Sequence, residues 1–85
     1  MKYIIVFKPR ASQELEQLPP IVLRRIRAAI AKLMNDPRPP GCKKLSGSDN
    51  AWRLRIGDYR VLYEVHDDQL LVRVFRIRHR KEAYR

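Results

Sequence analysis

Residues 52–65 have the sequence WRLRIGDYRVLYEV, in which two alternating runs of apolar and polar residues flank the pair Gly57-Asp58. Alternation with a period of two is typical of a strand with one buried face. A glycine at the first central position of a two-residue loop suits a type II′ turn. We therefore predict a tight β-hairpin with strands at Trp52–Ile56 and Tyr59–Val65, around which the rest of the chain is organised.

The two faces of the predicted hairpin differ in chemistry. Successive side chains of a strand point to opposite faces, so each strand presents an apolar row and a polar row. The apolar face can pack into a core, while the opposite face is rich in arginine. The apolar face consists of Trp52, Leu54, Ile56, Tyr59, Val61, Tyr63 and Val65, and the other carries Arg53, Arg55, Arg60, Leu62 and Glu64.

Upstream of the hairpin, the sequence predicts one strand and two helices. Lys2–Phe7 is rich in β-branched and aromatic residues, as strands are. From Ala11 to Leu18 the apolar residues recur every three or four positions, which predicts a short amphipathic helix. Two prolines then break the chain, and a second helix runs from Pro20 to about Met34.

The remaining segments connect to one last strand. Pro37–Asn50 is a loop rich in Pro, Gly, Ser and Asp, with a brief extended piece at Lys43–Leu45, and His66–Gln69 forms a turn. The last strand spans Leu70–Ile77. Strict alternation places Leu70, Val72, Val74, Arg76, Arg78 and Arg80 on one face, and Leu71, Arg73, Phe75 and Ile77 on the other.

This order of elements predicts a single α+β domain over residues 1–85. The expected topology is β-α-α-β-β-β, a mostly antiparallel four-stranded sheet with two N-terminal helices packed on one face. Arginines would line the remaining face of the sheet. Such a face is suited to binding phosphate groups.

Charge and composition narrow the classes of partner and compartment. With 19 Lys and Arg against 9 Asp and Glu, the net charge is +10, which points to nucleic acid or an acidic protein, and only weakly to an anionic membrane surface. No apolar run approaches the ~20 residues that a membrane span needs, and Tyr3–Phe7 is too short for a signal-peptide core. A single Cys42 fits a reducing cytoplasm, and one Cys with two His gives no metal-binding spacing.

The arginine-rich face offers anion binding more readily than proton transfer. Guanidinium groups hold phosphate oxygens in a bidentate way and stay charged, so they are poor general bases. Proton transfer would fall to His79, Tyr84, Glu64 or His66, and a cationic surround would lower the pKa of a tyrosine. The residues alone are equally consistent with a solvated arginine face, and they support no more than a basic domain that binds a polyanion.

Several motifs in this order resemble those of the RelE/ParE superfamily of bacterial toxin–antitoxin modules. The motifs are GDYRVLYEV at residues 57–65, IRHR at 77–80 and AYR at 83–85. The N-terminal half agrees as well, with a strand that ends at Phe7, two helices, and the KLSG element at residues 44–47 before the hairpin. The resemblance covers nearly the whole chain.

The resemblance to the RelE branch implies a ribosome-dependent mRNA interferase. Such enzymes cut mRNA in the ribosomal A site by attack of the ribose 2′-hydroxyl on the adjacent phosphate, without a metal or another cofactor. Arg60 and Arg80 would hold the scissile phosphate, and Tyr84 would orient the base and ribose. The implied catalytic residues are Arg53, Arg55, Arg60, His79, Arg80 and Tyr84, and the implied substrate-binding residues are Arg53, Arg55, Arg76, Arg78 and Lys81.

The same resemblance implies partners and leaves two alternatives open. A cognate antitoxin would neutralise the toxin, and the ribosome and mRNA would be its targets. Where known RelE members carry lysine on the first hairpin strand, this chain has Arg53 and Arg55, so His79 or Tyr84 would serve as base, or orientation and charge stabilisation would suffice. The alternatives are a non-enzymatic, ParE-like inhibitor of DNA gyrase and a plain basic RNA-binding module.

Overall fold

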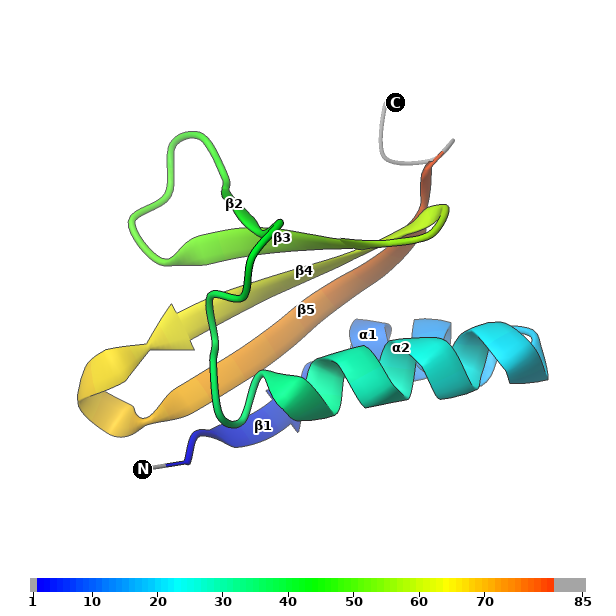
Figure 1. The fold of residues 1–85 in the computed structure, drawn as a ribbon, viewed down its shortest axis with the longest axis horizontal. Helices are drawn as coiled ribbons and strands as arrows, with labels where there is room; N and C mark the ends of the chain where they lie inside the picture. Colours follow the sequence, from blue (N-terminus) through cyan, green and yellow to red (C-terminus); the bar gives the residue numbers. More distant parts are fainter. Residues whose placement is uncertain (1, 81–85) are drawn as a thin grey trace.

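In the described part of the chain, five strands form one sheet, and two α-helices lie along it (Figure 1). The structure is a computed structural model that describes residues 2–80. The strands lie side by side in the order β1-β5-β4-β3-β2; β1 is parallel to β5, and the other neighbours are antiparallel. The elements are β1 (Ile4–Phe7), α1 (Pro9–Glu16), α2 (Pro20–Lys32), β2 (Lys43–Lys44), β3 (Ala51–Ile56), β4 (Tyr59–His66), the 3₁₀ helix η1 (Asp67–Gln69) and β5 (Leu71–His79).

The predicted α+β class and element order are confirmed, with one difference in the strand count. The expected sheet had four strands, whereas the observed sheet has a fifth, β2. This two-residue strand pairs Lys43 with Arg53 and Lys44 with Trp52. It corresponds to the brief extended piece expected in the loop, and its length is too short for a periodic sequence signal.

The hairpin of β3 and β4 has the geometry expected from its sequence. Ile56 pairs with Tyr59 across the turn. Gly57 has a φ of +58°, while the following Asp58 is not among the positive-φ residues. This combination matches a type II′ turn, whose twist agrees with that of the two strands. The prediction of a tight hairpin is therefore confirmed.

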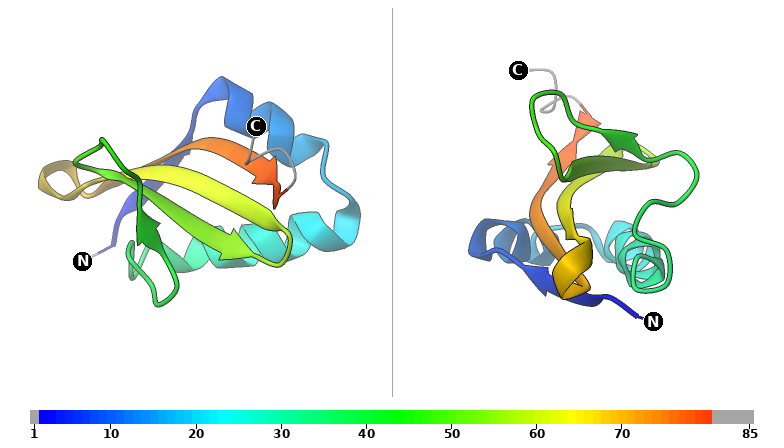
Figure 2. Two further views of the ribbon diagram at one scale, coloured as in Figure 1. Left: turned by 90° about the horizontal axis from the view of Figure 1, so that it is seen from above. Right: turned by 90° about the vertical axis from the view of Figure 1, so that its left-hand side faces the viewer.

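Both helices pack against the same face of the sheet. Ala11 and Leu15 of α1 and Ile26 and Ile30 of α2 join one hydrophobic core. The right-hand view of Figure 2 shows both helices below β3, β4 and β5. The sheet contributes Leu54, Val61, Tyr63, Val65, Val72, Val74 and Ile77 to this core.

Within residues 2–80, no helix is long and apolar enough to cross a membrane.

A β-bulge in β5 changes which side chains share a face. Leu62 pairs with Arg76 and the next residue, Tyr63, pairs with Val74, so Phe75 has no partner on β4. The extra residue shifts the alternation by one position. Val72 and Val74 are therefore buried in the core, although strict alternation placed them with Arg76 and Arg78. That part of the predicted parity is wrong, because a period of two does not reveal a bulge.

A polar cluster connects the residue directly before β1 to η1 and to the loop after α2. The Tyr3 hydroxyl donates to Asp67 Oδ1 at 2.6 Å, and the two Arg38 terminal nitrogens donate to the Asp67 carboxylate at 3.2 and 2.7 Å. Arg38 also lies over the Trp52 ring, with 5.3 Å from its Cζ to the ring centroid. The hydrogen bonds from Arg38 and then Tyr3 lower the pKa of Asp67 below its usual value.

The lowered pKa of Asp67 predicts how this cluster responds to acid. A carboxylate with a lowered pKa in the folded state stabilises the fold above its ordinary pKa of 3.8, and this contribution disappears as the pH falls through the folded-state value. We expect wild type to be more stable than Asp67→Asn at pH 6, and the difference to close below pH 3.8. Urea unfolding at several pH values measures this, with the neighbouring Asp68→Asn as control. A difference that stays constant down to pH 2 would contradict the prediction.

Candidate functional site

Three arginines stand in one row across three adjacent strands on the sheet face opposite the helices. Arg55 of β3 pairs with Arg60 of β4, and Arg60 pairs with Arg78 of β5. Guanidinium groups that lie side by side can bind the oxygens of one anion together, so such a row is suited to a phosphate. We call this set the arginine row.

The next row along the strands extends the positive charge. Arg53 pairs with Lys43 on one side and with Leu62 on the other, and Leu62 pairs with Arg76. Farther from the hairpin turn, the face becomes mixed. Glu64 pairs with Arg73 in register and forms an ion pair with it at 3.5 Å. The cationic character is therefore concentrated at the end of the sheet near the turn.

Arg60, at the centre of the arginine row, is more buried than Arg55 and Arg78. It is 6% exposed and is the only buried charged residue among residues 2–80. Burial restricts a side chain to few rotamers and lowers the local dielectric, so an anion that reaches this guanidinium interacts with it strongly. Within the arginine row, Arg60 thus has the least freedom to change rotamer.

The hairpin turn brings Arg80 next to the arginine row. The Arg80 backbone N–H donates to the Asp58 carbonyl at 2.6 Å, and its side chain is exposed. On the opposite strand, Arg55 Nε donates to the Gly57 carbonyl at 3.3 Å. The turn therefore contacts both β3 and the segment directly after β5. Lys81 and Tyr84, which the sequence also implicated, lie outside the described residues.

Groups suited to proton transfer are not grouped with the arginine row in the described part of the chain. His79 pairs with Tyr59 and stacks edge-to-face on its ring, with centroids 5.1 Å apart, on the helix side of the sheet. His79 therefore shares the face of Ile77, and the structure does not bring it together with Arg60. His66 and Glu64 contact each other at 3.1 Å, at the mixed end of the sheet.

Arg76 is engaged by a helix. Its Nε lies 3.2 and 3.3 Å from the two carboxylate oxygens of Glu14 on α1, and its Nη2 lies 3.2 Å from Glu14 Oε2. Both side chains are 21% exposed. The sequence predicted Arg76 as a substrate-binding residue, whereas the structure shows its guanidinium in a partly buried ion pair.

Two residues of this region carry no clear sequence signal. The bulge gives Phe75 the parity of the arginine side of β5, and it is absent from the hydrophobic core although it is half-buried. Lys43 reaches this face only because β2 pairs with β3. An aromatic ring beside arginines can stack on a nucleobase. No local signal indicates the position of Phe75, because the bulge is set by the pairing of β5 with β4.

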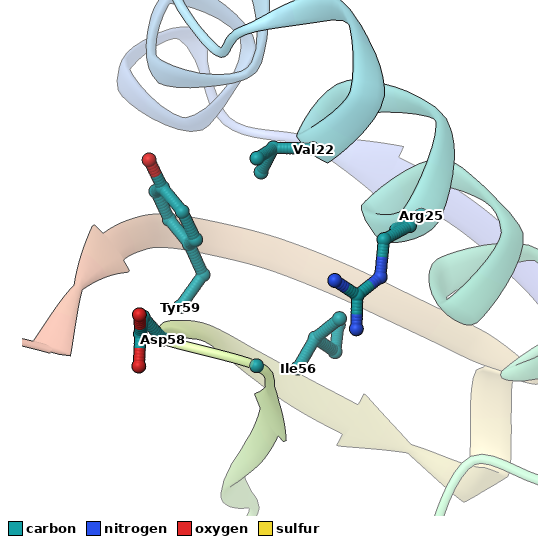
Figure 3. Close-up of a pocket in the computed structure, with 6 residues that line it drawn as sticks. Val22, Arg25, Ile56, Asp58 and Tyr59 are labelled. Atoms are coloured by element: carbon teal, nitrogen blue, oxygen red, sulfur yellow. The ribbon is translucent and has the colours of Figure 1, made fainter.

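Arg25 of α2 also approaches the hairpin turn from the helix side (Figure 3). A small pocket of about 120 Å³, lined by residues of α2 and the turn, lies between Arg25 and the turn. A Cβ added to Gly57 would lie 3.7 Å from the Arg25 guanidinium. No local sequence pattern connects Arg25 to the turn.

The positive φ of Gly57 predicts the effect of adding a side chain. We expect Gly57→Ala to lower the free energy of unfolding by about 1–2 kcal/mol, because an L-residue is strained at a φ of +58°. The contact with Arg25 is at ordinary van der Waals distance and adds little. Chemical denaturation measures the change. Asp58→Ala, in the same turn at a φ that L-residues tolerate, is the control, and equal losses in both variants would contradict the prediction.

The described residues offer anion-binding groups and no arrangement of metal ligands. Among residues 2–80, no group of three or more His, Cys, Asp or Glu side chains could hold a metal ion. What the site can do chemically is bind phosphates in a bidentate way and stabilise additional negative charge on them.

Comparison with protein families and known proteins identifies relatives of this chain. Residues 5–84 match the family described as the ParE toxin of the type II toxin–antitoxin system, parDE. The chain is 33% identical to the toxin RelG of Mycobacterium tuberculosis, and the similarity covers 100% of this chain and 99% of RelG.

Solved structures show the same fold. The archaeal RelE–RelB complex from Pyrococcus horikoshii matches with a TM-score of 0.84 at 27% identity, over 94% of this chain and 97% of the other. The intact RelBE toxin–antitoxin complex of E. coli matches with a TM-score of 0.79 at 25% identity, over 88% of this chain and 93% of the other.

Proposed function

Because this chain belongs to the RelE/ParE superfamily of toxins from toxin–antitoxin modules, we propose that it is a ribosome-dependent endoribonuclease of the RelE type that acts in the cytoplasm. Its substrate is mRNA in the ribosomal A site. The single observation that carries the proposal is the arginine row, Arg55–Arg60–Arg78, with Arg80 beside it. Four arginines at one end of a sheet are suited to bind RNA, because each of its nucleotides carries a negatively charged phosphate.

The proposed reaction needs charge stabilisation at one phosphate. The ribose 2′-oxygen attacks the adjacent phosphorus, and the bond from phosphorus to the 5′-oxygen of the next nucleotide breaks. The 2′-hydroxyl loses its proton and the leaving 5′-oxygen gains one, so the step leaves a 2′,3′-cyclic phosphate without a metal ion. The buried Arg60 and the exposed Arg80 hold the phosphate oxygens as negative charge builds up.

Of the four residues that the sequence offers for proton transfer, three lie away from the arginine row. His79 faces the helices, and Glu64 and His66 pair with each other at the mixed end of the sheet. Tyr84 is therefore the remaining candidate to orient the ribose and relay a proton. Orientation by Arg53 and Arg55 supplies the rest of the proposed rate enhancement, since guanidinium groups do not act as bases at neutral pH.

We further propose that a cognate antitoxin neutralises this chain. The related structure from Pyrococcus horikoshii is a RelE–RelB complex, and the one from E. coli is a RelBE toxin–antitoxin complex. The net charge of +10 favours an acidic segment in the partner. Expression of this chain alone is expected to arrest growth, and co-expression of an acidic protein encoded by a neighbouring reading frame is expected to relieve the arrest. Absence of growth arrest when the chain is expressed alone would count against a toxin role.

Primer extension on an mRNA undergoing translation tests the proposed cleavage. Wild-type protein is expected to produce new ends within the A-site codon in the presence of ribosomes and none on the naked mRNA. An Arg80→Ala, Tyr84→Ala double variant is expected to lose these cuts, while Arg24→Ala, on the exposed surface of α2, keeps them. No cuts with wild type, or unchanged cuts with the double variant, would overturn the proposal.

A second candidate function rests on the family match, which carries the ParE name. ParE-like toxins that inhibit DNA gyrase share the fold and need no cleavage chemistry. A supercoiling assay with purified gyrase separates the two candidates. Inhibition of supercoiling, together with intact mRNA in the translation assay, would favour the gyrase function over the ribonuclease function.

A further inference from the structure

Among residues 2–80, no strand lies along the outer edge of the half of β5 that carries Arg78 and leads to Arg80. β1 pairs with β5 only from Leu71 to Val74, and the last backbone hydrogen bond between them runs from Lys8 N–H to the Val74 carbonyl. The chain then turns into α1 at Pro9, which has no N–H to offer. Beyond Val74, the outer edge of β5 must therefore find other partners.

Glu14 of α1 takes the place of a strand at this edge. Its Oε1 accepts the Ile77 backbone N–H at 2.8 Å, and the same carboxylate forms the ion pair with Arg76. Glu14 is next to Leu15, which is anchored in the core together with Ala11 one helical turn earlier. The carboxylate is thus attached to a packed helix and contacts two consecutive residues of β5.

From this geometry we infer that Glu14 is a positioning residue for the candidate site, and that Arg76 serves the same purpose instead of binding a phosphate. Glu14 fixes the backbone of β5 at Ile77, directly before Arg78. It also holds the Arg76 guanidinium toward α1, since a side chain in a bidentate, partly buried ion pair is not available to a phosphate without breaking that pair. This inference rests on the proposed function for its effect on cleavage.

Three variants separate the two interactions of Glu14. Glu14→Ala removes both, Glu14→Gln keeps an oxygen that can accept the Ile77 N–H but loses the ion pair, and Arg76→Ala removes only the ion pair. Glu14→Ala is expected to lower kcat by about 10- to 100-fold with little change in KM, because a small shift of Arg78 misplaces the phosphate. Glu14→Gln is expected to recover most of this loss. Glu16→Ala, an exposed position on the same helix, is the control.

Two further measurements do not depend on cleavage. Amide hydrogen exchange at Ile77 is expected to stay slow in wild type and Glu14→Gln and to become fast in Glu14→Ala. The salt dependence of binding to a single-stranded RNA is expected to be unchanged in Arg76→Ala, whereas Arg78→Ala lowers the slope by about the equivalent of one phosphate contact.

The outcomes distinguish this inference from the proposed function. If wild type does not cleave, the ribonuclease function fails, but the exchange and salt measurements still test the role of Glu14. Slow Ile77 exchange in Glu14→Ala, or a salt slope in Arg76→Ala that falls as much as in Arg78→Ala, would overturn the inference. Equal losses of kcat in Glu14→Gln and Glu14→Ala would also contradict it.

Discussion

Replacing Arg60 with alanine is expected to lower the rate of mRNA cleavage by about 10²- to 10³-fold, the loss typical when one preorganised donor to a developing negative charge is removed. Arg60 is the centre of the arginine row and is 6% exposed, so its guanidinium is already oriented before substrate binds. Single-turnover cleavage on translating ribosomes measures this loss directly.

A lysine at the same position tests whether the planar guanidinium group of Arg60, with its paired N–H donors, is required. Arg60→Lys keeps the charge but offers no bidentate contact, so we expect it to recover only a small part of the lost rate. Arg73→Ala, at the mixed end of the same sheet face, is the control and should cleave at nearly the wild-type rate. Full activity in Arg60→Lys would show that charge alone suffices. Full activity in Arg60→Ala would remove the residue from the mechanism.

The second large effect concerns stability at Tyr63. Its side chain is 0% exposed, and its hydroxyl donates to the Pro37 carbonyl at 2.7 Å, which holds the loop after α2 against β4. We expect Tyr63→Ala to lower the free energy of unfolding by about 3–5 kcal/mol, as when other large aromatic side chains are removed from a core. At about 0.05–0.15 kcal/mol per residue, this is a large share of the stability of a chain this short.

Tyr63→Phe isolates the hydroxyl. It is expected to cost about 1 kcal/mol at pH 7, the typical net value of one hydrogen bond. Urea unfolding of both variants measures the two losses, and a Tyr63→Ala variant within 1 kcal/mol of wild type would contradict the burial argument. Tyr3→Phe, which loses an exposed hydroxyl contact with Asp67, is the matched control and should lose less.

The buried hydroxyl also predicts a response to alkaline pH. Burial raises the pKa of Tyr63 above its ordinary value of 10.0, so the unfolded chain releases this proton at a lower pH than the folded chain. Its stabilising contribution is therefore complete below pH 10 and is lost as the pH rises through the folded-state value. The stability of wild type should decline more steeply above pH 10 than that of Tyr63→Phe.

Local sequence patterns were sufficient for the hairpin and for the face that carries the arginines. Alternation around Gly57 gave the strands, and the positive φ of that glycine follows from the turn type. The same reasoning failed in β5, where the bulge at Phe75 shifts the parity. A bulge is set by pairing with the neighbouring strand, so alternation within one strand contains no information about it.

The contacts that complete the candidate site lie far apart in the chain. Glu14 and Arg76 are 62 positions apart, and no motif in either segment indicates the other. Arg25 meets the turn at Gly57 only because α2 packs beneath the hairpin. Such contacts follow from tertiary packing, which propensity and periodicity do not encode.

The pairing of β1 with β5 has a consequence for when the arginine row forms during synthesis of the chain. The first strand of the chain has the last strand as its only neighbour in the described sheet, and the third arginine of the row also lies on that last strand. A nascent chain that lacks residues 71–79 can form neither the complete sheet nor the row. Pairing between strands so far apart in the chain is also slow to form, because the whole intervening loop must close first. A growing polypeptide therefore lacks the arginine row until β5 has been made and has paired with β4.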